Sequence, residues 1–372
     1  MDVAKMTADV QTMFSVGERP WHGLGHVLDT APSCADAIKL AGLDWRVDLC
    51  PMFTTIPGVD MQVPIPGQRA VVRADNRAIL GVVGEGFAPL QNADAFAFFE
   101  PLVAEGLLSL ETAGALREGR RVWIMARIPG DPAEIVAGDT VDRYVLMCHG
   151  HDGSLALRAG FNPVRVVCQN TLSLALDSGD GMVCLRHTSG LPAGLARLRK
   201  VISEQIGIFN GTADAWRLLA ARSCSDLDFA AYALRLFALA RGEGDDAVRV
   251  LEPDATVGRR LLDDVRPLFE AGVGNDRKGV RGTWWAAYNA VTEWLTHHRG
   301  STAGTLREQA ERRFDSLHLG PGRRLGVRAL MLALDAAQDA PAADLPLMLP
   351  APDTAEIDAA PAADPLPASD LG

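Results

Sequence analysis

The stretch LSLETAGALREGRRVWIMARIP at residues 108–129 decides the fold class. Two runs of strand-forming residues, 108–116 and 121–129, flank the turn Arg117-Glu118-Gly119-Arg120, in which glycine stands where a positive φ is often required. We therefore predict a β-hairpin. A second hairpin is predicted at 69–84, where RAVVRADNRAILGVVG places two β-rich runs on either side of a polar turn. Hairpins this closely spaced favour antiparallel pairing, because parallel strands need long crossovers between them.

The pattern of apolar residues in the remaining chain indicates an α+β fold. Further strands are predicted at 141–149, 154–160 and 163–168, a short helix capped by Ser33 at 34–41, and a longer helix after Asn92. Apolar residues three and four apart dominate from 191 to 334, so the second half is predicted to be helical, with a linker and a short helix at 242–275. One of its helices should bury an aromatic face formed by Trp284, Trp285, Tyr288 and Trp294.

These patterns divide the chain into three regions. We expect a mixed domain with an antiparallel, hairpin-rich sheet at 1–190, and a helical region packed on it or continuing it at 191–334. A tail rich in Pro, Ala and Asp follows at 335–372, with too few periodic apolar positions to offset the entropy of ordering, so it should be disordered.

Composition limits the class of protein. The chain is 48% hydrophobic and 22% charged, as is usual for a globular protein. No apolar run is long enough to span a membrane, and the first residues lack the pattern of a signal peptide, which predicts a cytoplasmic protein with no membrane contact. The six cysteines occur singly, without a CxxC pair, so we expect free thiols, no metal and no cofactor.

The net charge of −11 is concentrated at one end. Residues 331–372 hold eight acidic side chains and no basic one, which leaves the preceding 330 residues close to neutral. Such an acidic tail would compete with nucleic acid for a basic surface or recruit a partner.

Two segments carry residues that could support catalysis. His151 and Asp152 belong to the motif HDGS at 151–154, in which Asp-Gly is typical of a tight turn between strands, and this turn interpretation is favoured over a metal site. Cys168, Gln169 and Asn170 follow a predicted strand, where a helix N-terminus would lower the pKa of a thiol. A structural role for the cysteine is the more ordinary interpretation.

A basic segment offers another kind of site. Residues 155–200 have a net charge of +4, and arginines on successive strands could line a groove for single-stranded DNA, with stacking on rings such as Trp123. The alternative is that these side chains are only a solvated surface. The candidate binding residues are Arg158, Arg165, Arg186, Arg197, Arg199 and Lys200.

Five stretches in the same order give the chain a family resemblance. They are WHGLG at 21–25, LGVVGEGFAPLQNADAF at 80–96, HDGS at 151–154, PVRVVCQNTL at 163–172 and GTWWAAYNAVTEWLTHH at 282–298. With these, and with FDSLHLGPGRRLGVRAL near the end, the chain resembles the phage/plasmid-like proteins built on domain of unknown function 932. The resemblance implies a mobile-element origin and supplies no catalytic residues.

These observations lead to three hypotheses on function. The first is non-enzymatic binding of single-stranded DNA by a homo-oligomer in replication or recombination, by analogy with single-strand-annealing proteins. The second is an enzyme that uses Cys168, His151 or Asp152 in hydrolysis or nucleic-acid processing. The third is a structural or host-interaction protein. The sequence favours the first, with no catalytic residue assigned.

Overall fold

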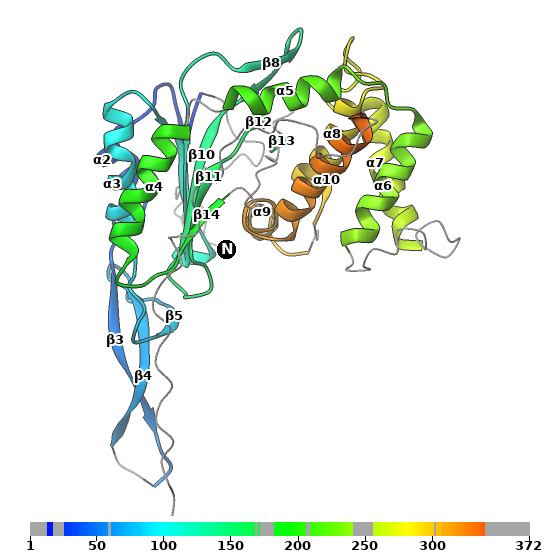
Figure 1. Cartoon of the computed structure of the whole chain (residues 1–372). Coiled ribbons are helices and arrows are strands. Elements are labelled where there is room, and N and C mark those ends of the chain that lie inside the picture. The colour runs from blue at the N-terminus through cyan, green and yellow to red at the C-terminus, as the bar shows by residue number, and fades with distance from the viewer. Residues whose placement is uncertain are drawn as a thin grey trace, which may run out of the picture.

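The computed structural model describes residues 13–17, 26–58, 61–167, 170–171, 182–205, 209–240, 256–300 and 303–338. Within them the chain is a mixed α+β protein, with sheets built from its first half and helices from its second half, as the sequence predicts (Figure 1). No helix in these ranges is long and apolar enough to cross a membrane.

A seven-stranded sheet forms the centre of the first half, in the order β14-β11-β10-β7-β6-β1-β2. All neighbours pair antiparallel except β1 and β2, which are parallel. The hairpin predicted at 108–129 is confirmed as β6 and β7, and Arg117 and Glu118 join Gly119 in the left-handed region of φ. The strands are β1 (Met13–Val16), β2 (His26–Leu28), β6 (Ser109–Leu116), β7 (Arg121–Arg127), β10 (Tyr144–Gly150), β11 (Leu157–Phe161) and β14 (Met182–Leu185).

Three helices cover one face of this sheet: α2 (Cys34–Leu40), α3 (Asn92–Ala104) and α4 (Leu191–Gln205) (Figure 1). Ser33 caps α2, as expected, by accepting a hydrogen bond from the Asp36 amide. Alternate residues of β7 and β10, such as Ile124 and Met147, face these helices and lie in the main core. The opposite face holds a smaller apolar cluster around Trp123 and Cys148.

A second sheet, in the order β3-β4-β5, contains the hairpin predicted at 69–84. Its strands are β3 (Val47–Thr55), β4 (Gln62–Arg73) and β5 (Ile79–Gly84). Strands β3 and β4 are long, and beyond Gln68 toward their tip they pair only with each other among the described residues. They extend as a two-stranded ribbon away from the rest of the molecule (Figure 1). This ribbon differs from the predicted strands, because Pro51, Pro64 and Pro66 interrupt the alternation that would indicate it in the sequence.

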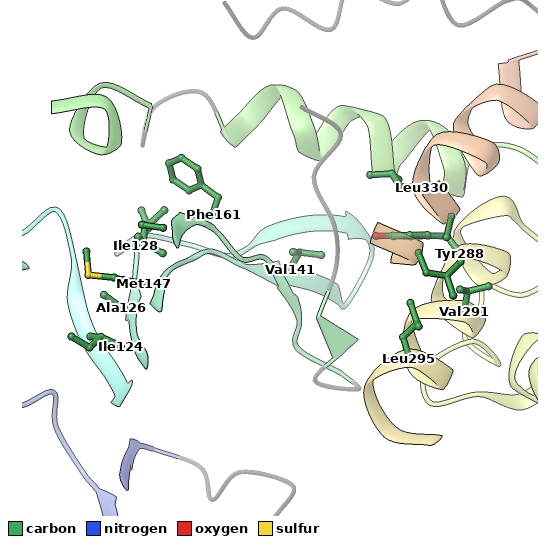
Figure 2. Packing of buried hydrophobic residues seen from close by; sticks show 14 of the residues in the cluster. Ile124, Ala126, Ile128, Val141, Met147, Phe161, Tyr288, Val291, Leu295 and Leu330 are labelled. Carbon is green, nitrogen blue, oxygen red and sulfur yellow. The ribbon is translucent and has the colours of Figure 1, made fainter. Parts of the chain in front are cut away.

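A third sheet joins the two halves of the chain. It has the order β13-β12-β9-β8, formed by β8 (Ala133–Val136), β9 (Asp139–Asp142), β12 (Val164–Arg165) and β13 (Asn170–Thr171). Helix α5 (Phe209–Ala220) packs against β8, and α8 (Trp284–Glu293) packs against β13. One hydrophobic cluster therefore runs from Ile124 and Met147, through Val141, to Tyr288 and Leu330 (Figure 2).

The helical half packs around a buried aromatic core. Trp285 and Tyr288 are fully buried and Trp284 and Trp294 nearly so, which confirms the predicted aromatic face. Helix α8 continues into a π-helical turn at Trp294–His298, which is labelled η4. The other elements are α6 (Asp226–Ala240), α7 (Thr256–Ala271), α9 (Leu306–Phe314), the π-helical turn η5 (Asp315–Leu319) and α10 (Pro321–Gln338).

Three local predictions need correction. Helix α7 has 16 residues and occupies much of the predicted linker, because its apolar face packs against α6 and α8. Asn170 and Thr171 pair with β12 instead of starting a helix. Helix α3 begins at Asn92, one residue earlier than expected, and the Asn92 side chain bonds the carbonyls of Leu43 and Trp45.

Candidate functional site

The HDGS motif forms the turn between β10 and β11, as predicted, and this turn fits closely against β5. A Cβ atom at Gly81 would lie 2.6 Å from the Asp152 Cα, and one at Gly153, where φ is +75°, would lie 2.9 Å from a methyl carbon of Val83. Asp152 accepts hydrogen bonds from the amide and the hydroxyl of Ser154. Two motifs that are 70 residues apart in the sequence thus meet at glycines that leave room for the contact.

Three histidines lie together behind this turn. His149 and His151 are fully buried and His187 is 7% exposed. The ring centroid of His149 lies 4.9 Å from that of His151 and 6.3 Å from that of His187. We call these three residues the histidine cluster. The sequence places His149 two residues before His151, at alternate positions that share one face of a strand, but nothing in it places His187 beside them.

Two members of the histidine cluster, His151 and His187, have a polar partner for one ring nitrogen. The Asn92 amide group donates to two backbone carbonyls, so its Oδ1 atom is the one that faces His151, and His151 Nε2 donates to it over 3.0 Å. The hydrogen-bond partner of His151 Nε2 is therefore the Asn92 side chain. His187 Nδ1 lies 3.2 Å from the Ala88 carbonyl oxygen. Neither ring nitrogen of His149 has a hydrogen-bond partner among the described residues.

Burial makes the cluster a neutral group. Burial, together with the neighbouring His187, lowers the pKa of His151 to about 4. Burial also lowers the pKa of His187, and it lowers the pKa of His149 well below the usual value, reinforced by the other two histidines. The three imidazoles are therefore uncharged near pH 7, and their location inside the core is typical of a packed structural element.

The residues of the enzyme hypothesis are not assembled into a reactive constellation in the described part of the chain. Asp152 serves the turn, His151 is held by Asn92 inside the core, and Cys168 and Gln169 lie outside the described residues. Asn170 belongs to β13. Across the described ranges, no group of three or more His, Cys, Asp or Glu side chains is arranged to hold a metal ion.

The six predicted nucleic-acid ligands do not share one surface. Arg158 lies on the face of the sheet opposite the helices, where it donates to the Leu319 carbonyl. Arg197, Arg199 and Lys200 lie on α4, on the other side of the sheet, and Arg199 donates to the Phe98 carbonyl of α3. Arg186 follows β14 and is exposed.

Arg165 differs from the other five because it is fully buried. Its guanidinium forms a bidentate ion pair with buried Asp139, with nitrogen to oxygen distances of 2.6 and 2.8 Å, and Trp285 Nε1 donates to the same carboxylate over 2.9 Å. Arg165 also bonds the Asn275 side chain. This arginine ties the third sheet to the helical half, and its guanidinium is not accessible to a phosphate.

A different group of arginines gathers around η5. Arg117 and Arg121, from the turn between β6 and β7, both bond the Asp315 carboxylate, at 2.5 and 2.7 Å. The Arg117 side chain is 45% exposed, while Asp315 is 11% exposed. The β6–β7 turn therefore lies directly against the junction of α9 and α10.

The surroundings of Asp315 are rich in positive charge. A Cβ atom at Gly322 would lie 2.7 Å from the Ser316 carbonyl oxygen, so the start of α10 lies close against η5. Within 117–121, 311–324 and position 158, the only acidic residues are Glu118, Glu311 and Asp315. The arginines, which we call the η5 arginine group, are Arg117, Arg120, Arg121, Arg158, Arg312, Arg313, Arg323 and Arg324.

The η5 arginine group borders the smaller apolar cluster of the sheet. Trp123 lies beside Phe314, with ring centroids 5.1 Å apart, and Leu319 packs on the same cluster. Trp123 is only 7% exposed, so it supports η5 and is not open for stacking on bases. The sequence signals of this site were the arginine pairs in REGRR and ERRF, but nothing in the sequence places these segments together.

The fold and this surface define a mixed α+β protein with a basic junction between its sheet and its helical half. The model of the family "Domain of unknown function (DUF932)" matches residues 79–318, and the chain belongs to this family. The match includes the β6–β7 turn, the histidine cluster and η5 up to His318. No curated protein and no solved structure matches the chain.

Proposed function

We propose that this protein binds single-stranded DNA, without catalysing a reaction, as a cytoplasmic component of phage or plasmid replication or recombination. The observation that carries the proposal is the η5 arginine group, in which Arg117 and Arg121 both bond Asp315 and Arg158 bonds the Leu319 carbonyl. The pairs Arg312-Arg313 and Arg323-Arg324 flank η5 in the sequence. Arginine side chains hold phosphates by bidentate hydrogen bonds and release condensed counterions when they do so.

Exposure and charge support this surface over the one predicted from the sequence. Arg117, Arg120, Arg312 and Arg324 of the η5 arginine group are exposed, although Arg323 is buried. In the predicted set Arg165 is buried, and Arg158 lies on the opposite side of the sheet from the residues of α4. Asp315 neutralises part of the charge and also holds Arg117 and Arg121 in fixed orientations, which lowers the entropy cost of binding a phosphate. The mobile-element role rests on the five stretches that resemble phage/plasmid-like proteins.

The proposal includes two further elements. Several copies of the protein assemble along one strand, as single-strand-annealing proteins do. The acidic tail, with eight acidic and no basic residues at 331–372, competes with DNA for the arginines. A chain that ends at Asp339 should therefore bind single-stranded DNA more tightly, and an unchanged affinity would remove the tail from the proposal.

A pair of double variants tests the location of the site. Arg117→Ala with Arg120→Ala should weaken binding of a single-stranded oligonucleotide and reduce the slope of log K against log salt concentration by about 0.7 for each lost contact. Arg197→Ala with Lys200→Ala is the matched control, because these exposed residues lie on α4, on the other side of the sheet. The control should bind like the wild type.

Two results would contradict the proposal. A wild-type protein with no affinity for single strands at low salt ends it. Equal losses in the two double variants would mean that binding responds to net charge and not to the η5 arginine group. Thermal unfolding of each variant provides the control for folding, and the Arg117 change should lower stability by less than about 1 kcal/mol, as is usual for an exposed ion pair.

A further inference from the structure

Exposed apolar side chains are concentrated on the sheet formed by β3, β4 and β5. Six of the eleven large hydrophobic residues that are exposed in the described part of the chain lie within 47–84. They are Leu49, Phe53, Ile56, Met61, Ile79 and Val82. Single exposed apolar residues are ordinary on a protein surface, but a concentration of this kind marks an interaction site.

Within the described residues the outer half of the ribbon is open to solvent, since Phe53 is 51% exposed and Met61 is 67% exposed. Residues 53–55 pair with residues 62–64 and, among the described residues, with no third strand, and the ribbon extends away from the other described elements (Figure 1). Apolar residues lie on both faces, beside polar Thr54, Thr55 and Gln62: Phe53 pairs with Pro64 on one face, while Val63 and Ile65 lie on the other. An isolated two-stranded ribbon is at best marginally stable in water.

We propose that the β3–β4 ribbon is an assembly arm that a second copy of this chain encloses. The exposed apolar side chains of the arm need a binding partner that is present wherever the protein is present. A second copy of the same chain satisfies this condition. Charge fits as well, since residues 49–68 contain a single charged residue, Asp60, so two arms meet with little electrostatic repulsion. This inference names the surface for the self-assembly within the proposed function, and it is independent of DNA binding.

Size and backbone chemistry define the kind of contact. Seven residues per strand give an outer ribbon about 25 Å long and about 10 Å wide, or about 250 Å² on each face. If each copy encloses the arm of the other, the faces and edges of the two arms together bury about 1,200 Å². This area is at the lower end of the range for a stable protein–protein interface. Pro51, Pro64 and Pro66 have no backbone N–H to offer an added strand, so the copies meet by side-chain packing and not by extending the sheet.

The mass of the full chain in the absence of nucleic acid tests the arm. Sedimentation of the wild type should give about twice the monomer mass of 39.7 kDa. Phe53→Asp with Ile56→Asp should weaken this association by about 100-fold or more, because four carboxylates would enter the contact. Leu227→Asp is the matched control, since Leu227 is 83% exposed on α6, and it should leave the mass unchanged.

Amide hydrogen exchange gives a second measurement that needs no variant. Exchange at residues 50–56 and 61–65 of the wild type should slow as the protein concentration rises, because enclosure protects the arm. A wild type that stays monomeric, an arm variant that sediments like the Leu227 control, or exchange that is fast at every concentration would each overturn the inference.

Binding of an oligonucleotide short enough for one copy separates this inference from the DNA-binding proposal. The arm variant should keep the affinity of the wild type for this oligonucleotide, since the η5 arginine group does not include the arm. If the wild type dimerises through the arm but does not bind the oligonucleotide, the DNA-binding proposal fails and the arm stands. If the wild type binds the oligonucleotide but stays monomeric, the arm inference fails and the DNA-binding proposal stands.

Discussion

Two arginine–aspartate sites in this protein use the same side chains in opposite surroundings. Arg165 and Asp139 are both fully buried, whereas Arg117 is 45% exposed beside Asp315. The buried pair is enclosed by Trp285 and Asn275, so its charges act only on each other and on the helical half. The exposed pair leaves one side of the guanidinium open to solvent. Exposure, and not residue type, separates an arginine that holds the fold together from one that can bind a phosphate.

The largest expected effect comes from breaking the buried ion pair between Arg165 and Asp139. Arg165→Met should lower the free energy of unfolding by about 3–5 kcal/mol, because it leaves the Asp139 carboxylate buried without its ion-pair partner. Urea denaturation measures the loss. The matched change Arg117→Met should cost less than about 1 kcal/mol. Equal costs at the two sites would show that burial does not separate them.

A second prediction concerns the histidine cluster, whose imidazoles are neutral because they are buried in the core of the sheet and not exposed at the surface. The pKa of His151 is lowered to about 4 in the folded protein, whereas an unfolded histidine titrates near 6.5. The unfolded state therefore binds more protons below pH 6.5, and stability should fall as the pH falls from 6.5 toward 4, by on the order of 3 kcal/mol for this residue. Denaturation curves at several pH values in this range measure the slope.

Changing one histidine sharpens this test. His149→Leu removes two ring nitrogens that have no hydrogen-bond partner among the described residues, so it should leave stability at pH 7 nearly unchanged and flatten the acid slope. His151→Leu also flattens the slope but should destabilise the protein at pH 7, because it leaves Asn92 Oδ1 without its donor. If both variants keep the wild-type slope, other groups cause the acid sensitivity.

The smallest expected effect concerns Glu111 on β6. Burial raises its pKa to about 7, Asp142 adds to the shift, and Arg127 opposes it. Because the folded pKa exceeds the unfolded value of about 4.5, stability falls as the pH rises from 4.5 to 7. A shift of this size corresponds to about 3 kcal/mol by linkage, and partial exposure of the Glu111 side chain to solvent reduces it to about 1 kcal/mol. Glu111→Gln should therefore raise stability at pH 8 by about 1 kcal/mol and have no effect below pH 4.5, as thermal melts at the two pH values would show.

Local sequence patterns predicted well those structural elements that are determined by residues close together in the chain. Alternation and turn residues indicated both hairpins, Ser33 indicated the cap of α2, and helical spacing indicated the aromatic core around Tyr288. Such features depend on contacts within a few residues. Helix α7 was underestimated and residues 170–171 were misassigned, because contacts with distant elements decide both.

The sequence alone determined the α+β class, the order of strands before helices, the acidic tail and the family resemblance, since each follows from composition or from patterns along the chain. Only the tertiary structure decided which arginines are exposed. Position along a strand gives the face on which a side chain lies, but not what covers that face. Arg165 is covered by the helical half, from residues more than 100 positions away, and Arg117 meets Asp315 from nearly 200 positions away. Long-range packing therefore determined which charges hold the fold together and which remain at the surface.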